Sequence, residues 1–268
     1  MGIYLIIGGS GVMGTAAIRA LRTTYGQEAT IVANWFGKED PDFKIENANH
    51  TVFGDITDPD CLKKIQSFSG GRFDAMFYAT ALGEVGVPIK MATPEQIKQS
   101  NKLSFDPILY LEENLDIGMI VAYSTFYLLK HQLGSYGAMA HSKEAIEKWV
   151  LQPGKSRHAC IRAGLFQSAS SRGIKLLLRK NAKHLDQIKD PLLQSYFRGV
   201  PPSEGIKKFE EGISNEEKET YGDSNTDADS LYEAHLTLFK TENPVFVNVC
   251  GKKIWLSDEP LLLKDHIG

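Results

Sequence analysis

The feature that most constrains the fold is a glycine-rich stretch near the start of the sequence, which lies between two segments of opposite character. An apolar run, Ile3–Ile7, precedes it and favours a β-strand, and a helix-forming run over residues 15–25 follows it. The stretch itself reads Gly8, Gly9, Ser10, Gly11, Val12, Met13 and Gly14. Its second, third and last glycines match G-x-G-x-x-G, in which a tight turn lets the backbone and a helix N-terminus approach a pyrophosphate. We therefore predict a dinucleotide-binding loop, the alternative being a glycine turn that binds no ligand.

Apolar runs recur along the chain and alternate with helical segments. After the first strand, further strands are expected at residues 29–34, 51–53, 73–78, 119–123, 159–162 and 245–249. Helix signals separate them, among them a capping box that begins at Thr93 and a helix expected from Tyr136 to Leu151. This alternation predicts an α/β fold, a Rossmann-type doubly wound parallel sheet of about seven strands with helices on both faces. We expect one such domain over residues 1–268.

The connection between the sixth and seventh expected strands is much longer than the others. Residues 165–240 fill it, and a connection of this length is largely helical or functional. Residues 172–198 contain seven basic side chains against two acidic ones, whereas acidic side chains dominate residues 204–229. Such charge runs are typical of solvated helix faces, which remain the alternative. We predict a helical substrate cap over residues 165–240.

The composition narrows the classes of partner and compartment. Of 268 residues, 42% are hydrophobic and 24% charged, and a formal net charge of −3 gives no basic field for nucleic acid. No apolar run approaches the length of a membrane span, and no basic leader precedes the first strand, so we expect a cytoplasmic protein without nucleic-acid or membrane partners. Cys61, Cys160 and Cys250 lie far apart beside expected core elements. This spacing favours buried free thiols over a disulfide or a metal site.

Ser124, Tyr136 and Lys143 follow the fifth expected strand, beside the place where a nicotinamide ring would lie. Seven steps of 100° fall about 20° short of two helical turns, so a continuous helix would present Tyr136 and Lys143 on one side. A tyrosine is a weak acid with a pKa of about 10, but a nearby ammonium stabilises its phenolate. A serine hydroxyl can donate a hydrogen bond to an oxygen on which charge develops. These roles suit hydride transfer, and the alternative is a surface tyrosine and a solvated lysine.

With these residues, the chain resembles the short-chain dehydrogenase/reductase superfamily over residues 2–164 and in the last expected strand. The loop at residues 8–14 is similar to the form found in extended and atypical members. The resemblance implies that Asp55 and Ile56 contact the adenine and that Ala79 contacts the cofactor. Asn101 either matches a helix asparagine that organises a water relay in these enzymes or is a polar residue of a helix surface.

The catalytic signature departs from the usual Tyr-x-x-x-Lys of this superfamily, because position 140 is alanine. The longer spacing of Tyr136 and Lys143 is similar to that in the divergent enoyl-acyl-carrier-protein reductases. Met139 and the Ser104-Phe105 pair also resemble that branch, but its glycine loop differs and it usually has a second tyrosine just before the active-site one. The resemblance implies that Ser124 and Tyr136 hydrogen-bond the substrate oxygen and that Lys143 holds the nicotinamide ribose.

The sequence also bears on the choice between NAD(H) and NADP(H). An NAD site has a carboxylate about 20 residues after the glycines, and here that position is the neutral Asn34. Lys38 follows shortly and could pair with a 2′-phosphate. We therefore favour NADP(H) over NAD(H).

Three functions are consistent with these patterns. The first is an NAD(P)H-dependent reductase of a small-molecule or thioester-linked substrate, either a 2-enoyl thioester or a ketone, and an acyl carrier protein is then a candidate partner for the basic segment. The second is a dinucleotide-binding regulator that senses redox state without catalysis, and the third is a nucleotide-sugar isomerase or epimerase. Assembly into a homo-oligomer is compatible with each of them.

Overall fold

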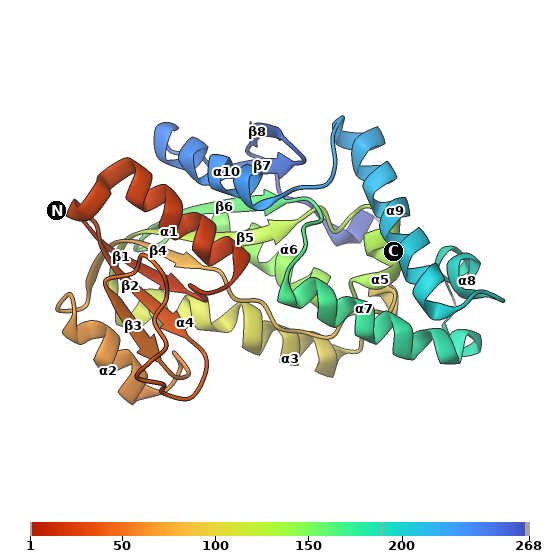
Figure 1. The fold of residues 1–268 in the computed structure, drawn as a ribbon, viewed down its shortest axis with the longest axis horizontal. Helices are drawn as coiled ribbons and strands as arrows, with labels where there is room; N and C mark the ends of the chain where they lie inside the picture. The colour runs from red at the N-terminus through yellow and green to blue at the C-terminus, as the bar shows by residue number, and fades with distance from the viewer. Residues whose placement is uncertain (1, 189, 266–268) are drawn as a thin grey trace.

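A single sheet of eight strands organises the molecule, and the computed structural model describes residues 2–188 and 190–265 (Figure 1). Lys189 of the basic segment lies outside the described residues. The strands are ordered β3-β2-β1-β4-β5-β6-β7-β8. They are β1 (Ile3–Ile7), β2 (Thr30–Trp35), β3 (His50–Phe53), β4 (Arg72–Tyr78), β5 (Asp116–Thr125), β6 (Arg157–Ala163), β7 (Phe246–Cys250) and β8 (Lys253–Ser257). All seven predicted strands are present and parallel, and the doubly wound α/β fold is confirmed.

The eighth strand was not predicted. β8 pairs antiparallel with β7, and Gly251 at a φ of 58° lies in the tight turn between them. Its side chains are partly or fully exposed, so it lacks the continuous apolar run that marks the buried strands. An edge strand of this kind gives a weak sequence signal.

Helices cover both faces of the sheet, because successive side chains of each central strand point to opposite sides and both sets are apolar. α1 (Val12–Tyr25) and α10 (Ala228–Lys240) pack on one face. α2 (Pro59–Ser67), α4 (Asp106–Asn114) and α6 (Met139–Val150) pack on the other. The three cysteines are buried free thiols.

The long connection after β6 has a small core of its own. α7 (Ala169–Asn181), α8 (Pro191–Phe197) and α9 (Pro202–Tyr221) gather beyond the ends of the strands, next to the short α5 (Lys130–Ser135) (Figure 1). Leu178, Leu193 and Phe209 are among the apolar side chains that hold these helices together. α10 also falls within residues 165–240, but it packs on the sheet. Of the helices in this connection, α7, α8 and α9 are therefore the ones that stand apart from the sheet.

Two local helix predictions had different outcomes. The capping box at Thr93 is present, and it begins α3 (Pro94–Ser104). The helix expected from Tyr136 begins instead at Met139, so the prediction was wrong at its start. Gly137 has a φ of 50°, in the left-handed region, and this residue separates α5 from α6. No helix among the described residues is both long and apolar enough to cross a membrane.

Candidate functional site

The register of the sheet brings the ends of three strands to one edge. Ile7 pairs with Asn34 on one side and with Tyr78 on the other, so Gly8 and Ala79 begin neighbouring loops beside Trp35, the last residue of β2. The loop after β1 runs directly into the N-terminus of α1, where Gly11 is the N-cap residue. Backbone N–H groups at such a terminus attract an anion.

Each glycine of the loop has a different reason to lack a side chain. Gly8 has a φ of 78°, which favours glycine. A Cβ on Gly14 would lie 2.3 Å from the carbonyl oxygen of Gly8, and one on Gly9 would lie 2.9 Å from the Cβ of Ala33. Gly11 is less crowded by protein atoms, and it lines the pockets described below. The loop therefore fits a pyrophosphate, with two glycines needed for packing and Gly11 at the ligand surface.

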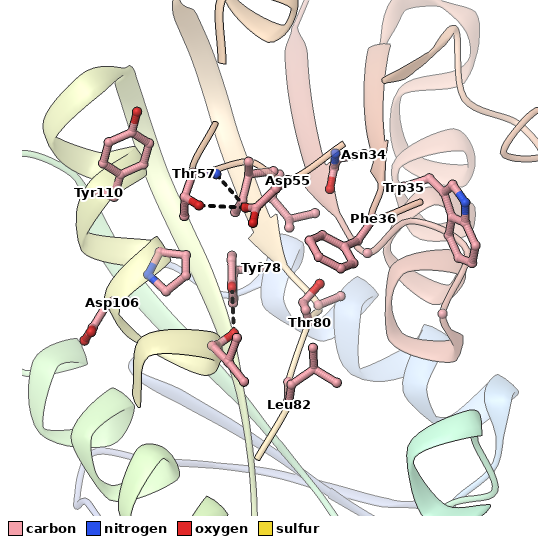
Figure 2. A pocket seen from close by; sticks show the side chains of 18 of the residues that line it. Asn34, Trp35, Phe36, Asp55, Thr57, Tyr78, Thr80, Leu82, Asp106 and Tyr110 are labelled. Carbon is pink, nitrogen blue, oxygen red and sulfur yellow. Dashed lines mark hydrogen bonds between the residues drawn. The ribbon is translucent and has the colours of Figure 1, made fainter. Parts of the chain in front are cut away.

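The larger of two adjoining pockets has a volume of about 580 Å³ and lies over the ends of β1, β2, β3 and β4 (Figure 2). Seven predicted cofactor residues line it, namely Gly8, Ser10, Gly11, Asn34, Asp55, Ile56 and Ala79. The carboxylate of Asp55 accepts hydrogen bonds from the backbone N–H and the hydroxyl of Thr57, at 2.9 and 2.8 Å. These bonds fix Asp55 at the rim of the pocket, where a purine amino group could donate to it.

The residues expected to read the adenosine ribose are arranged differently from the prediction. The amide nitrogen of Asn34 donates to the carbonyl oxygens of Val52 and Gly54, so this side chain ties β2 to β3. Lys38 is exposed and is not among the residues that line the pocket. The basic residue that does line it is Lys102 of α3. Trp35 and Phe36, which sequence reasoning missed, add exposed aromatic surface at the end of β2.

The smaller pocket, of about 200 Å³, shares Gly11, Ala79, Thr80 and Ala81 with the larger one, so the two form one trough. Ser124, Tyr136 and Lys143 all line this pocket, together with the loop residues Val12 and Met13. α7 lines it too, through Ser171 and Ile174. The structure therefore brings together the three side chains that the sequence singled out. Asn101 lines neither pocket, and its buried Oδ1 has no hydrogen-bond partner among the described residues.

Tyr136 and Lys143 reach the pocket from different elements. Tyr136 lies in the turn before α6, and Lys143 lies within α6, so the single-helix geometry inferred from their spacing does not apply. Burial raises the pKa of the Tyr136 phenol above its usual value, so this group is a neutral donor at ordinary pH. Burial lowers the pKa of Lys143 to about 8, and its ammonium donates to the carbonyl oxygen of Tyr123 at 2.8 Å.

The hydroxyl groups at the end of β5 are already hydrogen-bonded to protein. Ser124 donates to Oε1 of Glu147 at 2.5 Å, and Thr125 donates to the carbonyl oxygen of Ala163 at 2.8 Å. The sequence did not reveal Glu147 as part of the site. The charged Arg162 within the apolar run of β6 was an available signal, because a charge in a buried strand requires a partner.

Comparisons with known proteins agree with this geometry at the level of the fold. No protein-family model matches the chain, and no curated protein matches its sequence. A short chain dehydrogenase family protein from Francisella tularensis subsp. tularensis SCHU S4 is similar in structure, with a TM-score of 0.60 and 19% identity, over 92% of this chain and 97% of that one. A short-chain dehydrogenase from Streptomyces avermitilis has a TM-score of 0.58 and 14% identity, over 92% and 87%. A short chain dehydrogenase from Burkholderia cenocepacia J2315, solved in complex with NADP, has a TM-score of 0.57 and 15% identity, over 91% and 87%.

The chain has the short-chain dehydrogenase/reductase fold. The similarity covers most of each chain. The fold expected from the resemblance is thereby confirmed.

Proposed function

We propose that this protein is an NAD(P)-dependent oxidoreductase that interconverts a carbonyl group and an alcohol on a small substrate. The observation that carries the proposal is the continuous trough, which begins at a glycine loop fitted to a pyrophosphate and ends at Tyr136 and Lys143. The NADP complex of the Burkholderia relative supports a nicotinamide cofactor here. When bound, the nicotinamide would supply or accept a hydride.

Tyr136 and Lys143 have different roles in this proposal. The neutral phenol of Tyr136 donates a proton to the oxygen of a carbonyl substrate and becomes a phenolate, and in the reverse direction the phenolate accepts the proton of an alcohol. Lys143 is held in place by its bond to the backbone of Tyr123 and has donors left over for the nicotinamide ribose. The surroundings that shift both pKa values also strengthen the interactions of these groups with a bound ligand.

The state of Ser124 favours carbonyl chemistry over enoyl reduction. The sequence interpretation gave the oxygen of a 2-enoyl thioester two donors, Ser124 and Tyr136. The single proton of the Ser124 hydroxyl is donated to Glu147, which leaves the phenol as the donor of the pair. A site in which the Tyr136 phenol is the donor suits a carbonyl oxygen, which takes up one proton when the carbonyl is reduced.

Reduction of a 2-enoyl thioester remains a second candidate because of a basic groove between α7 and α9. The groove has a volume of about 490 Å³, and Arg172, Lys175, Arg179 and Lys207 line it. Lys175 pairs with Glu210 at 2.8 Å. Glu210 is the acidic residue of the lining, against four basic ones, so positive charge exceeds negative charge in the groove. An acidic carrier protein or a phosphopantetheine arm would complement this groove.

We propose NADP(H) as the preferred cofactor, with Lys102 rather than Lys38 as the partner of the 2′-phosphate. Lys102 is the basic residue in the lining of the larger pocket, whereas Lys38 is outside it. The neutral Asn34 adds no carboxylate to repel the phosphate, and its amide is held by β3.

A panel of substrates tests the proposed reaction. Secondary alcohols with NADP⁺, and ketones and a crotonyl thioester with NADPH, would be followed by the absorbance of the reduced nicotinamide. We expect turnover of alcohols and ketones and little of the crotonyl thioester. Saturation of the crotonyl thioester without ketone reduction would instead support the enoyl reductase. Tight cofactor binding without turnover of any member would support the non-catalytic regulator.

A further inference from the structure

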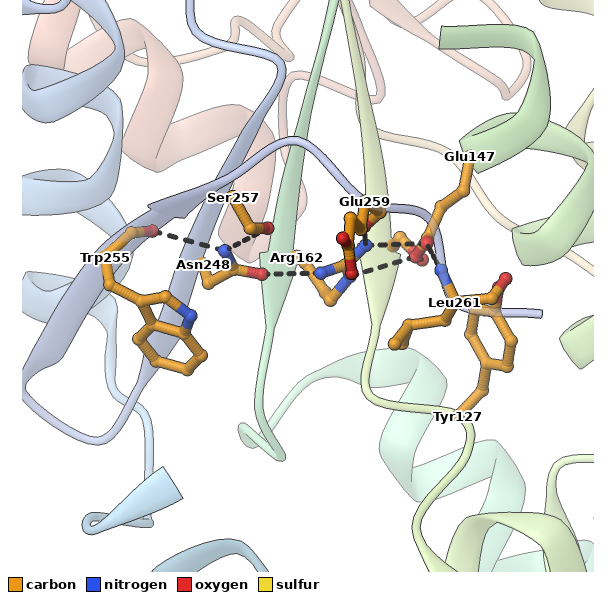
Figure 3. A network of polar contacts seen from close by, with 9 residues as sticks. Tyr127, Glu147, Arg162, Asn248, Trp255, Ser257, Glu259 and Leu261 are labelled. Carbon is orange, nitrogen blue, oxygen red and sulfur yellow. Dashed lines mark hydrogen bonds and ion pairs between the residues drawn. The ribbon is translucent and has the colours of Figure 1, made fainter. Parts of the chain in front are cut away.

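Three neighbouring strands carry polar side chains at paired positions near α6, and Figure 3 shows two of them, Arg162 and Asn248. Parallel register pairs Ser124 of β5 with Arg162 of β6, and Arg162 with Asn248 of β7. Paired residues of neighbouring strands point to the same face, so all three side chains lie on the face of the sheet that α6 packs on. The guanidinium of Arg162 donates to Oδ1 of Asn248 at 2.8 Å and lies over the ring of Phe246. At these three positions polar contacts take the place of the apolar contacts found elsewhere on this face of the sheet.

Glu147 of α6 joins these side chains, one helical turn after Lys143. Its side chain is fully buried, and both oxygens accept hydrogen bonds. Oε1 accepts from Ser124 at 2.5 Å and from Nε of Arg162 at 3.1 Å. Oε2 accepts from Nη2 of Arg162 at 2.7 Å and from the backbone N–H of Leu261 at 2.7 Å. A buried charge of this kind is stable only when it is paired and hydrogen-bonded, and Glu147 meets both conditions.

The four donors around Glu147 determine where the Ser124 proton lies. A carboxylate that pairs with a guanidinium carries no proton of its own, so the hydrogen in the Ser124–Glu147 bond comes from the serine. A hydroxyl has one donor and two acceptor lone pairs. Ser124 also lines the smaller pocket, so what it can offer a ligand there is a lone pair.

We propose that Glu147 is a positioning residue that holds Ser124 as a hydrogen-bond acceptor toward the substrate. The substrate oxygen that fits beside Ser124 then bears a hydrogen, as an alcohol does. A ketone oxygen has no hydrogen to give and would face the lone pairs of Ser124 without a bond. The identity of the substrate group rests on the proposed oxidoreductase function, whereas the direction of the Ser124 proton does not.

The chain offers a matched control for Glu147. Glu144, on the same helix, accepts the backbone N–H of Leu263 at 2.8 Å, as Glu147 accepts that of Leu261. Both carboxylates therefore anchor residues 261–263, but only Glu147 also bonds Ser124. Glu144→Gln tests loosening of this segment, and Glu147→Gln tests release of the Ser124 proton.

Proton NMR at low temperature tests the direction of the Ser124 bond without any substrate. A buried hydroxyl proton held on a carboxylate should give a slowly exchanging resonance downfield of the amide region. We expect it in the wild type and in Glu144→Gln, and we expect its loss in Ser124→Ala and in Glu147→Gln. If Glu147→Gln does not fold, Ser124→Ala decides the assignment alone. A folded wild type without this resonance, or a resonance that persists in Ser124→Ala, would overturn the positioning role.

Titration of the NADP⁺-loaded protein with cyclohexanol and with cyclohexanone tests the substrate group. We expect the alcohol to bind about tenfold more tightly than the ketone, as one hydrogen bond to a buried group allows. The preference should disappear in Ser124→Ala and in Glu147→Gln, and it should survive in Ser124→Thr and in Glu144→Gln. Equal binding, or no binding, of the two probes by the wild type would overturn the alcohol assignment. Absence of turnover in the substrate panel, with the resonance and the alcohol preference intact, would count against the oxidoreductase function alone.

Discussion

Where the trough meets the glycine loop it is formed by the backbone of one continuous stretch, whereas at its nicotinamide end it is lined by side chains from distant segments. The glycine loop and α1 come from one continuous stretch, residues 8–25, and their geometry follows from local sequence. Ser124, Tyr136 and Lys143 come from a strand, a turn and a helix, and their geometry depends on how these elements pack. Substitutions at the first end should therefore act on binding as a whole, and those at the second should act on individual steps.

The largest effect is expected from Gly11→Asp, which tests the backbone-built end. The new carboxylate would lie at the N-terminus of α1 and occupy the place of the pyrophosphate, so dinucleotide binding should be abolished. Isothermal titration with NADPH measures this. Gly173→Asp in α7 makes the same change where a new Cβ meets no atom within 4 Å apart from its chain neighbours and its own helix backbone, and this variant should bind NADPH normally. Undiminished affinity in a folded Gly11→Asp protein would contradict the assignment of the whole trough.

The next largest effect is expected from Tyr136→Phe, at the end built from side chains. Loss of the phenol proton should lower kcat by about 10² to 10⁴ and leave the Kd for NADPH within a factor of about two. Steady-state rates and cofactor titrations separate the two effects. Tyr232→Phe, which removes a hydroxyl bonded to Thr23 on α1, is the control. A parallel loss of cofactor affinity in Tyr136→Phe would mean that the two ends are not independent.

A smaller effect is expected from Lys102→Gln, which tests whether Lys102 binds the 2′-phosphate at the adenosine end of the trough. Removal of a cation from the 2′-phosphate should weaken NADPH binding about tenfold and leave NADH binding unchanged. Lys38→Gln should change neither, because Lys38 lies outside the pocket. A loss of NADPH affinity in Lys38→Gln alone would restore the partner inferred from sequence.

The smallest effect is expected on the free energy of unfolding, from a substitution of Glu217. This residue contacts Leu165, which lines the nicotinamide end of the trough. Burial raises the pKa of Glu217 from 4.5 to about 7. Between these values the folded carboxyl keeps a proton that the unfolded one has released, so the free energy of unfolding falls as the pH rises through this window. Its Oε1 accepts the backbone N–H of Leu165, while Oε2 has no partner among the described residues. Glu217→Gln should therefore stabilise the protein by about 1 kcal/mol above pH 7, with no gain below pH 4.5.

Glu216 provides the control of opposite sign. Although burial would raise its pKa, hydrogen bonds from the His131 ring and from the backbone of Lys130 and His131 lower it below the usual value. Glu216→Gln should accordingly destabilise the protein at neutral pH. Thermal unfolding of both variants at pH 4.5 and pH 8 makes the comparison. A loss of stability in Glu217→Gln at pH 8 would show that the carboxylate is better solvated than its burial indicates.

The same contrast explains which features the sequence could predict. The strand, turn and helix over residues 3–25 are specified locally by an apolar run, glycines and a helix former, and all three were predicted at nearly their observed bounds. The start of α6 was missed because the backbone before it pairs with a distant segment, in which the N–H of Gly137 donates to the carbonyl oxygen of Val87 at 3.0 Å. Glu147 was missed because a charged residue on a helix usually lies at the surface. Its burial depends on Arg162, fifteen positions later, which no local pattern reveals.

The hydrogen bond from Leu261 to Glu147 has a consequence for the order in which the molecule is made. The glycine loop is synthesised before residues 259–263, which follow it by about 250 positions. On a ribosome, β1, β2 and α1 can pair while the Ser124 network still lacks one of its four donors. We therefore expect a growing chain to recognise a dinucleotide before it can orient a substrate, so that affinity for the cofactor precedes catalytic competence in time.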